Sequence, residues 1–288
     1  MFIKIINIVL LFFFTNILFS INIVNDIRKN IETIYSFGKR DIFSSGRDKT
    51  FYFLKNKFKS YNYDIKEYLF SYNINHIRIE GKNLFAYRDN GSDFIIIAAH
   101  YDSKYFKDFS FLGANDNISG IVATIAIAGI LKDKFELLKD ISLGFLFIDM
   151  EESIFRWSSS DGLYGSRKQV DLWTKDNFIK RIKYFILLDM VGDPDTVFCK
   201  EVNSDPDLTN KIWEYASRFG YTFFKNCYSN IEDDHIPFIK SGVKSTDIIP
   251  YPFPWYWHTQ YDTIDKISPD FIATISVFIS NFILNEIK

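Results

Sequence analysis

The nonapeptide Phe94-Ile-Ile-Ile-Ala-Ala-His-Tyr-Asp102 indicates the fold class most clearly. Its first six residues, Phe94–Ala99, form a short and uninterrupted apolar run, which is typical of a central strand buried on both faces. His100 and Asp102 follow directly, at the point where such a strand would end. In open α/β sheets, ligands bind outside the carboxyl ends of the strands. The segment therefore predicts a buried strand with functional side chains at its end.

The rest of the chain alternates strand-like and helix-like runs around this segment. Further runs of strand length are Ile65–Tyr72, Asn83–Tyr87, Ser142–Ile148, Tyr184–Leu188 and a short one near Thr246–Ile249. Helical spacing recurs in Asn22–Phe37, Thr50–Lys59, Ile118–Leu131, Asp207–Phe219 and Pro269–Lys288. Strands that alternate with helices predict an α/β fold. We expect a single-domain three-layer sandwich, with a central mixed, mostly parallel sheet flanked by helices.

Composition places these elements in one domain, residues 21–288. A chain of 288 residues, 47% of them hydrophobic, can bury one substantial core, and we find no repeat or linker that would divide it. A net charge of −2 provides no field that favours nucleic acid or anionic membranes, so we expect neither as a partner, and we expect a monomer. Cys199 and Cys227 could pair in an oxidising compartment, but two cysteines leave this open.

Residues 1–20 have the pattern of a secretory signal peptide. Lys4 provides a short positive region, residues 5–19 are almost all apolar, and Ser20 is a small residue near a cleavage point. The apolar run is short for a membrane span, and an uncleaved N-terminal anchor is the alternative. We therefore expect a secreted or exported protein, in a periplasm or a secretory pathway.

Histidine and carboxylate side chains follow successive predicted strands. Besides His100 and Asp102, they are Asp149, Glu151, Glu152, Asp189 and His258, while Asp116 lies in a tight turn before a predicted helix. Zinc takes imidazole and carboxylate ligands, and an α/β fold can bring them together from separate strand ends. The pattern therefore predicts a zinc site at one edge of the sheet.

Glu151 and Glu152 are adjacent acids directly after a predicted core strand. Two carboxylates in such a place repel each other unless one binds a cation and the other can take up a proton. A zinc ligand beside a general acid/base satisfies both conditions. The alternative interpretation is a solvated pair of loop residues.

Other candidates have simpler interpretations as well. Asp116 or its neighbour Asn117 could cap the helix that follows. His258 lies among aromatic residues and could be a packed side chain. In the acidic run Glu232-Asp-Asp-His235, either aspartate could cap the start of a helix.

Six motifs resemble those of the glutaminyl-peptide cyclotransferases, zinc enzymes related to the co-catalytic zinc aminopeptidases. The resemblance extends from about residue 25 to the C-terminus. The motifs are His100-Tyr-Asp-Ser-Lys104, Gly113-Ala-Asn-Asp116, Asp149-Met-Glu-Glu152, Leu188-Asp-Met-Val-Gly192, Glu232-Asp-Asp-His-Ile-Pro-Phe238 and Pro252-Phe-Pro-Trp-Tyr-Trp-His-Thr259. Trp157 and the segment Asp161–Arg167 also resemble the family after the paired glutamates.

The resemblance implies one zinc ion per chain, held by Asp116, Glu152 and His258. A fourth position would stay open for water or substrate, as catalytic zinc requires. Glu151 matches the family's proton-transfer residue. The implied substrate is a peptide or protein with an N-terminal glutamine, which is cyclised to pyroglutamate with release of ammonia.

The remaining matches concern substrate recognition. Asp189 and Asp233 match two acids that are linked by hydrogen bonds beside the reacting amide. The implied apolar walls of the substrate pocket are Trp157, Ile231, Phe253 and Trp257.

A secreted zinc aminopeptidase of the same fold is the rival function. The two-zinc peptidases use a five-ligand set, which here would be His100, Asp116, Glu152, Asp189 and His258. The ligand types alone therefore do not separate the two activities. Trp157, the segment Glu232–Phe238 and the loop Pro252–Thr259 resemble the cyclotransferases and favour cyclisation.

Overall fold

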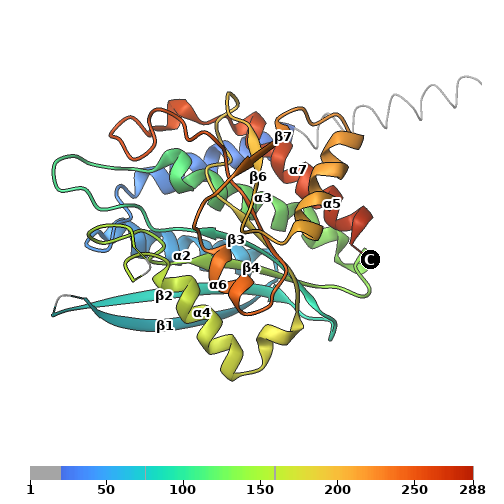
Figure 1. Cartoon of the computed structure of the whole chain (residues 1–288), viewed down its shortest axis with the longest axis horizontal. Coiled ribbons are helices and arrows are strands. Elements are labelled where there is room, and N and C mark those ends of the chain that lie inside the picture. The colour runs from blue at the N-terminus through green and yellow to red at the C-terminus, as the bar shows by residue number, and fades with distance from the viewer. Residues whose placement is uncertain (1–20, 75, 159, 288) are drawn as a thin grey trace, which may run out of the picture.

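A six-stranded mixed sheet forms the centre of the computed structural model, which describes residues 21–74, 76–158 and 160–287 (Figure 1). The strand order is β1-β2-β4-β3-β5-β8. Four neighbouring strands are parallel: β3 (Phe94–His100), β4 (Ser142–Ile148), β5 (Ile182–Leu188) and β8 (Ser245–Ile248). β1 (Asp64–Ile74) and β2 (Ile77–Arg88) form an antiparallel hairpin, and β2 pairs antiparallel with β4. The expected mixed, mostly parallel sheet is confirmed.

Burial on both faces explains why strand β3 is apolar at every position before His100. Side chains alternate between the two faces of a strand. Ile95 and Ile97 belong to the core on one face, while Phe94, Ile96 and Ala98 belong to the core on the other. Every residue of β3 is buried, so neither face tolerates a polar side chain before the strand ends at His100.

Helices cover both faces and complete three layers. The larger core contains residues from the helix at 21–36 and from α2 (Ser45–Ser60), α3 (Gly120–Leu131), α5 (Pro206–Arg218) and α7 (Pro269–Glu286). The opposite core contains Trp173 from α4 (Tyr164–Lys175) and Phe238 from α6 (His235–Lys240). Helix α3 is apolar and buried on nearly all sides, because it lies between the sheet and α7.

The remaining elements are short. They are the π-helical turn η1 (Ala114–Ser119), the 3₁₀ turns η2 (Lys132–Leu137), η3 (Phe178–Arg181) and η4 (Ile264–Lys266), and a parallel pair of strands, β6 (Phe198–Glu201) and β7 (Phe224–Ser229). Cys199 of β6 and Cys227 of β7 form a disulfide, which settles the pairing that the sequence left open.

Sequence patterns missed α4, β6 and β7 for physical reasons. The buried positions of α4 are occupied largely by Gly165, Ser166 and Gln169, so that helix lacks an apolar stripe. β6 and β7 are four and six residues long, and each mixes apolar with polar or charged residues, so neither contains an apolar run.

The proposed signal segment, residues 1–20, lies outside the described residues. Within 21–74, 76–158 and 160–287, no helix has the length and apolar composition needed to cross a membrane.

Two glycines of α3 give a matched test of the helix–sheet contact. A Cβ on Gly120 would lie 2.2 Å from the carbonyl oxygen of Leu188, whereas on Gly129 the nearest atom, the Tyr61 hydroxyl, would be 3.4 Å away. We expect Gly120→Ala to lower the free energy of unfolding by about 1–3 kcal/mol, because the backbones must separate. Gly129→Ala should leave it unchanged or raise it by up to about 1 kcal/mol. Urea unfolding of both variants measures the difference, and equal stabilities would contradict the predicted close packing.

Candidate active site

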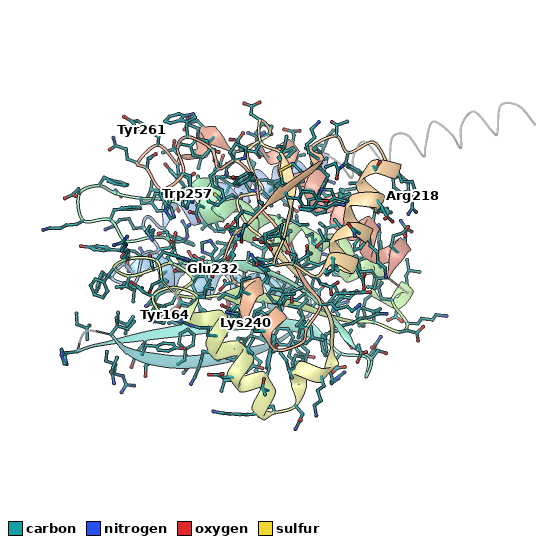
Figure 2. All side chains as sticks on the ribbon, viewed as in Figure 1. Tyr164, Arg218, Glu232, Lys240, Trp257 and Tyr261 are labelled. Carbon is teal, nitrogen blue, oxygen red and sulfur yellow. A yellow bond between two sulfur atoms is a disulfide. The ribbon has the colours of Figure 1, made fainter. Side chains whose placement is uncertain are left out.

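A cavity of about 490 Å³ opens at the carboxyl ends of the parallel strands. β3 leads into the segment with His100 and Asp102, β4 into the paired glutamates, and β5 into Asp189. The cavity is lined by every residue assigned above to the catalytic, wall and metal-binding sets, namely Asp116, Glu151, Glu152, Trp157, Asp189, Ile231, Asp233, Phe253, Trp257 and His258. Trp257 and Glu232, on two different loops at this cavity, are labelled in Figure 2.

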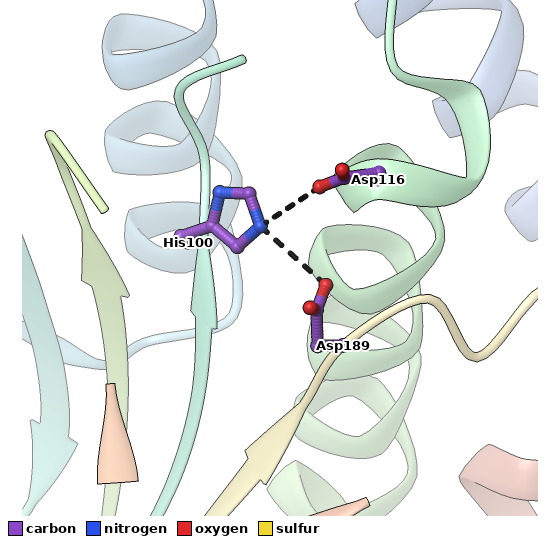
Figure 3. Close-up of side chains that lie close together, drawn as sticks. All are labelled: His100, Asp116 and Asp189. Atoms are coloured by element: carbon purple, nitrogen blue, oxygen red, sulfur yellow. Dashed lines mark ion pairs between the residues drawn. The ribbon is translucent and has the colours of Figure 1, made fainter. Parts of the chain in front are cut away.

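The first group of possible metal ligands is deeply buried. His100 Nε2 lies 3.2 Å from Asp116 Oδ1 and 3.4 Å from Asp189 Oδ1, as Figure 3 shows. Each of the three residues offers one ligand atom, and these atoms lie within 4.8 Å of one another, so they could hold a metal ion. His100 itself does not line the cavity, so this group lies at its inner wall.

The second group shares Asp116 with the first. His258 Nε2 lies 3.2 Å from Asp116 Oδ2 and 3.2 Å from Glu152 Oε1, and the three residues could also hold a metal ion. All three line the cavity, so an ion here could reach a bound molecule. The two oxygens of Asp116 thus face different histidines. The geometry can accommodate one ion in either group, or two ions bridged by Asp116.

The side chain of Asp262 positions Asp116 by binding the backbone at this turn. Asp262 accepts hydrogen bonds from the N–H groups of Asn115, at 2.7 Å, and Asp116, at 3.1 Å. The side chain of Asn117, and not that of Asp116, accepts the N–H of Gly120 at the start of α3, at 2.8 Å. The capping interpretation is therefore wrong for Asp116 and fits Asn117, which leaves the Asp116 carboxylate available to the histidines.

Asp102 holds the backbone of the paired glutamates, Glu151 and Glu152. Asp102 accepts hydrogen bonds from the N–H groups of Glu151, at 3.1 Å, and Glu152, at 3.2 Å. Lys104 Nζ lies 3.2 Å from Glu152 Oε2, so it holds one oxygen while Oε1 faces His258. Because both glutamates are buried, the interpretation as a solvated loop pair is wrong.

Burial dominates the electrostatics of the proton-binding candidates. Burial raises the pKa of Glu151 well above its usual value; His100 opposes the shift, and Glu152 and Asp233 add to it. The pKa of Asp233 is likewise raised by burial and then by Asp189. Burial also raises the pKa of Asp189, although His100 acts against it. These carboxyl groups can therefore hold a proton in conditions where an exposed acid would not.

In the second metal group, His258 and Asp116 have pKa values shifted in favour of their ionised forms. Burial lowers the pKa of His258, but Glu152 and Asp116 outweigh it and raise the value to about 9. Burial would raise the pKa of Asp116, but His100 and His258 hold it well below its usual range. A carboxylate that stays ionised beside two imidazoles is a suitable cation ligand.

Asp189 and Asp233 both line the cavity. Asp189 Oδ1 faces His100 Nε2 at 3.4 Å, and Asp233 Oδ2 is buried without a hydrogen-bond partner among the described residues. Asp189 adds to burial in raising the pKa of Asp233, so the two carboxyl groups interact. A hydrogen bond between two carboxyl groups needs a proton on one of them, so the link that the resemblance implies stays a prediction.

The aromatic wall residues come from two ordered loops. Asp161 accepts the N–H groups of Ile154, Phe155 and Arg156, at 2.7–2.9 Å, and so orders the loop that ends at Trp157. The rings of Trp257 and His258 stack with their centroids 4.0 Å apart, so His258 is packed and also faces the metal group. Trp157 and Trp257 are 38% and 36% exposed, which leaves surface for a ligand.

Several residues that shape the site were not assigned a role from sequence. Asp102 and Lys104 belong to a recognised motif, but nothing in their spacing shows that they contact Glu151 and Glu152. Asp262 lies 146 positions from Asp116, so no local pattern relates the two. In the run Glu232–His235, Asp234 occupies the N-cap position of α6, but its side chain makes no capping hydrogen bond.

The fold and the site first define a class. An α/β sandwich with two histidine–carboxylate groups at the ends of parallel strands has the architecture of a metal-dependent α/β enzyme. The chain belongs to peptidase family M28, whose model matches residues 82–283.

Individual relatives agree with the resemblance found in the motifs. The glutaminyl-peptide cyclotransferase of Dictyostelium discoideum is 33% identical over 219 residues, which are 66% of this chain and 60% of that protein. The chain spans 60% and 65% of the length of two such curated relatives, less than two thirds in each case. The crystal structure of a glutaminyl cyclase from an Acidobacteriales bacterium matches with a TM-score of 0.81 at 29% identity, over 93% of this chain and 94% of that one. A leucine aminopeptidase precursor from Bacteroides thetaiotaomicron has the same fold, with a TM-score of 0.81 at 23% identity over 91% and 97% of the two chains.

Asp102 gives a direct test of how the glutamates are positioned. Asp102→Asn replaces one acceptor oxygen with an amide that faces a backbone N–H, so Glu151 and Glu152 should shift. We expect zinc affinity to fall about 10–100-fold, as for other residues that orient metal ligands. Competition with a chelator measures the Kd. The exposed Asp108→Asn is the matched control and should bind zinc normally; an unchanged Kd for Asp102→Asn would contradict the positioning role.

Proposed function

We propose that this chain is a zinc-dependent glutaminyl cyclase, which converts the N-terminal glutamine of peptides to pyroglutamate and releases ammonia. The observation that supports it best is the cavity itself. One small space is bounded by aromatic walls, a histidine–carboxylate metal group and three further buried acids. The cyclotransferases and cyclases among the relatives support the same activity.

Zinc fits the residues Asp116, Glu152 and His258. The donor set is two carboxylates and one imidazole, which suits catalytic zinc with an open fourth position. Lys104 and the N–H groups bound by Asp102 restrain Glu152, so this ligand is oriented before the metal binds. Zinc would supply Lewis acidity toward the γ-carbonyl group of the glutamine.

Glu151 is the residue that we assign to proton transfer. The α-amine of the substrate attacks its own γ-carbon, so the nucleophile is intramolecular and the pocket mainly has to orient it. Glu151 accepts a proton from the attacking amine and then donates it to the departing amide nitrogen, which leaves as ammonia. A buried carboxyl group with a raised pKa is suited to both steps. No net proton is gained or lost in the exchange.

Asp189 and Asp233 would orient the glutamine amide. Both line the cavity, and Asp233 has a buried oxygen without a partner in the described part of the chain, so the amide N–H₂ group can donate to these carboxylates. Trp157, Ile231, Phe253 and Trp257 would contact the aliphatic part of the side chain. An N-terminal glutamate should react far more slowly, because its carboxylate is a poor electrophile and these acids would repel it.

An aminopeptidase is the second candidate, and one observation favours it. The group His100, Asp116 and Asp189 could hold a second ion beside the first, as two-metal hydrolysis would need. His100 of this group does not line the cavity, whereas Asp116, Glu152 and His258 all do, which favours a single ion at the cavity and hence the cyclase.

Peptides that begin with glutamine and peptides that begin with leucine or alanine distinguish the two activities. Purified, zinc-loaded protein should release ammonia from Gln-initiated peptides and no free amino acid from Leu- or Ala-initiated ones. Ammonia is measured by a coupled assay and free amino acids by chromatography. If the protein releases leucine and leaves glutaminyl peptides uncyclised, the proposed cyclase function is wrong and the aminopeptidase function takes its place.

Metal content is a separate prediction. We expect one tightly bound zinc per active chain, because Asp116, Glu152 and His258 line the cavity while His100 does not. Elemental analysis of dialysed, active protein measures the ratio. Two tightly bound zinc ions per active chain would count against the cyclase.

Glu151→Gln separates proton transfer from metal binding. The substitution preserves shape but removes the group that accepts protons, so we expect kcat to fall about 10²–10⁴-fold with zinc content unchanged. Glu152→Gln should weaken zinc binding itself, and the exposed Glu136→Gln is the control for the same chemical change. Turnover close to that of the wild type in Glu151→Gln would assign the proton transfer to another group.

We also propose export, with residues 1 to about 20 removed, and action as a monomer on peptides or proteins that begin with glutamine. Lys4, the apolar run and Ser20 support the first part. N-terminal sequencing of the protein from its native host should begin near residue 21, and an intact N-terminus on cytosolic protein would refute export. Sedimentation should give the mass of one chain.

A further inference from the structure

We propose that Glu201, a residue outside the cavity, positions the wall of the substrate pocket formed by residues 230–233. We call these residues the wall segment; they comprise Asn230, Ile231, Glu232 and Asp233, and all four line the cavity. The inference rests on the proposed function only where it concerns catalysis. Its structural part stands without it.

The Glu201 carboxylate accepts five hydrogen bonds although it is 2% exposed. Oε1 accepts the N–H of Asn203 at 2.9 Å, the side-chain amide of Asn203 at 2.7 Å and the N–H of Ile231 at 3.2 Å. Oε2 accepts the hydroxyl of Ser204 at 3.0 Å and lies 2.9 Å from His235 Nε2. Glu201 therefore contacts both the wall segment, at Ile231, and the first residue of α6, His235.

Asn203 forms a second connection between Glu201 and the wall segment. Its side-chain amide also contacts Asn230 Oδ1 at 2.9 Å and the carbonyl oxygen of Ile231 at 3.2 Å. On the other side, the hydroxyl of Ser204 accepts the N–H of Asp247 in β8 at 3.1 Å. Glu201 thus connects the wall segment to the edge strand of the central sheet.

The wall segment depends on these contacts because it belongs to no strand or helix. β7 ends at Ser229 and α6 begins at His235. Ile231 and Asp233 occur one and three positions beyond Asn230, so a displacement of this stretch moves an apolar wall and an acid of the cavity together. Burial opposes ionisation of Glu201, but His235 and the N–H donors hold its pKa at about 2, so the carboxylate stays an acceptor at neutral pH.

Glu201→Met keeps the length of the side chain and removes both carboxylate oxygens. The five hydrogen bonds from Asn203, Ser204, Ile231 and His235 then lose their shared acceptor. We expect hydrogen exchange at residues 229–235 to become at least about tenfold faster, with exchange in α3 unchanged. Zinc Kd should stay within about twofold, because Asp116, Glu152 and His258 lie elsewhere. kcat/KM for a glutaminyl peptide should fall about tenfold, with KM carrying the larger share.

Two further variants make the result decisive. Glu214→Met, on the exposed face of α5, is the same chemical change and should alter none of these quantities. Asn203→Ala keeps Glu201 but removes the side chain that reaches Asn230 and Ile231, and Asn203 is partly exposed, so this variant should fold. It should accelerate exchange at 229–235 in the same direction, by less.

The outcomes separate the positioning role from the proposed activity. A merely structural role would lower Tm and leave local exchange and KM unchanged while the protein stays folded. Exchange at 229–235 equal to that of the wild type in folded Glu201→Met overturns the inference, and if that variant does not fold, Asn203→Ala decides on the same criterion. If the wild-type protein cyclises no glutaminyl peptide, the cyclase is wrong, and the exchange measurements still decide the role of Glu201.

Discussion

Repulsion among buried carboxylates is the constraint on which this structure depends. Asp116, Glu151, Glu152, Asp189 and Asp233 face one cavity, and all five are buried. Ionised groups that lose water without a partner are costly, so each needs a cation, a donor or a proton. Asp116 has two histidines, Glu152 has Lys104 and His258, and the remaining three acids have raised pKa values. This excess of buried carboxylates lowers stability, and it also makes the cavity suitable for a divalent cation and for proton transfer.

Loops around the cavity are ordered by a repeated device, a side-chain carboxylate that accepts hydrogen bonds from backbone N–H groups. Asp102 holds the paired glutamates, Asp262 holds Asn115 and Asp116, and Asp161 holds the loop before Trp157. Glu201 does the same for the wall segment. Each replaces the missing strand or helix partners of a loop with charge-assisted hydrogen bonds, which are stronger than neutral ones. The site is therefore built on loops whose backbones are held by side-chain carboxylates.

Much of the sheet and most of the site were predictable from local patterns. Uninterrupted apolar runs located β3 and β4 to the residue or within one, because strands buried on both faces leave no choice of side-chain type. The acids at the strand ends were predictable because a parallel sheet collects those ends at one edge. α4 was missed because three of its five buried residues are small or polar, and β6 and β7 because they are short and contain no apolar run.

The sequence by itself determined the α/β class, the order of the central elements and the residues that meet in the cavity. These features follow from side-chain types and from short motifs, which depend only on a residue and its neighbours in the sequence. Only the tertiary structure decided that Asn117, and not Asp116, caps α3 and that Asp116 is shared by two possible metal groups. It also decided the roles of Asp102, Asp262 and Glu201. The reason is physical: a hydrogen bond between residues 30 to 150 positions apart depends on the distance and direction between two atoms, and the fold sets both.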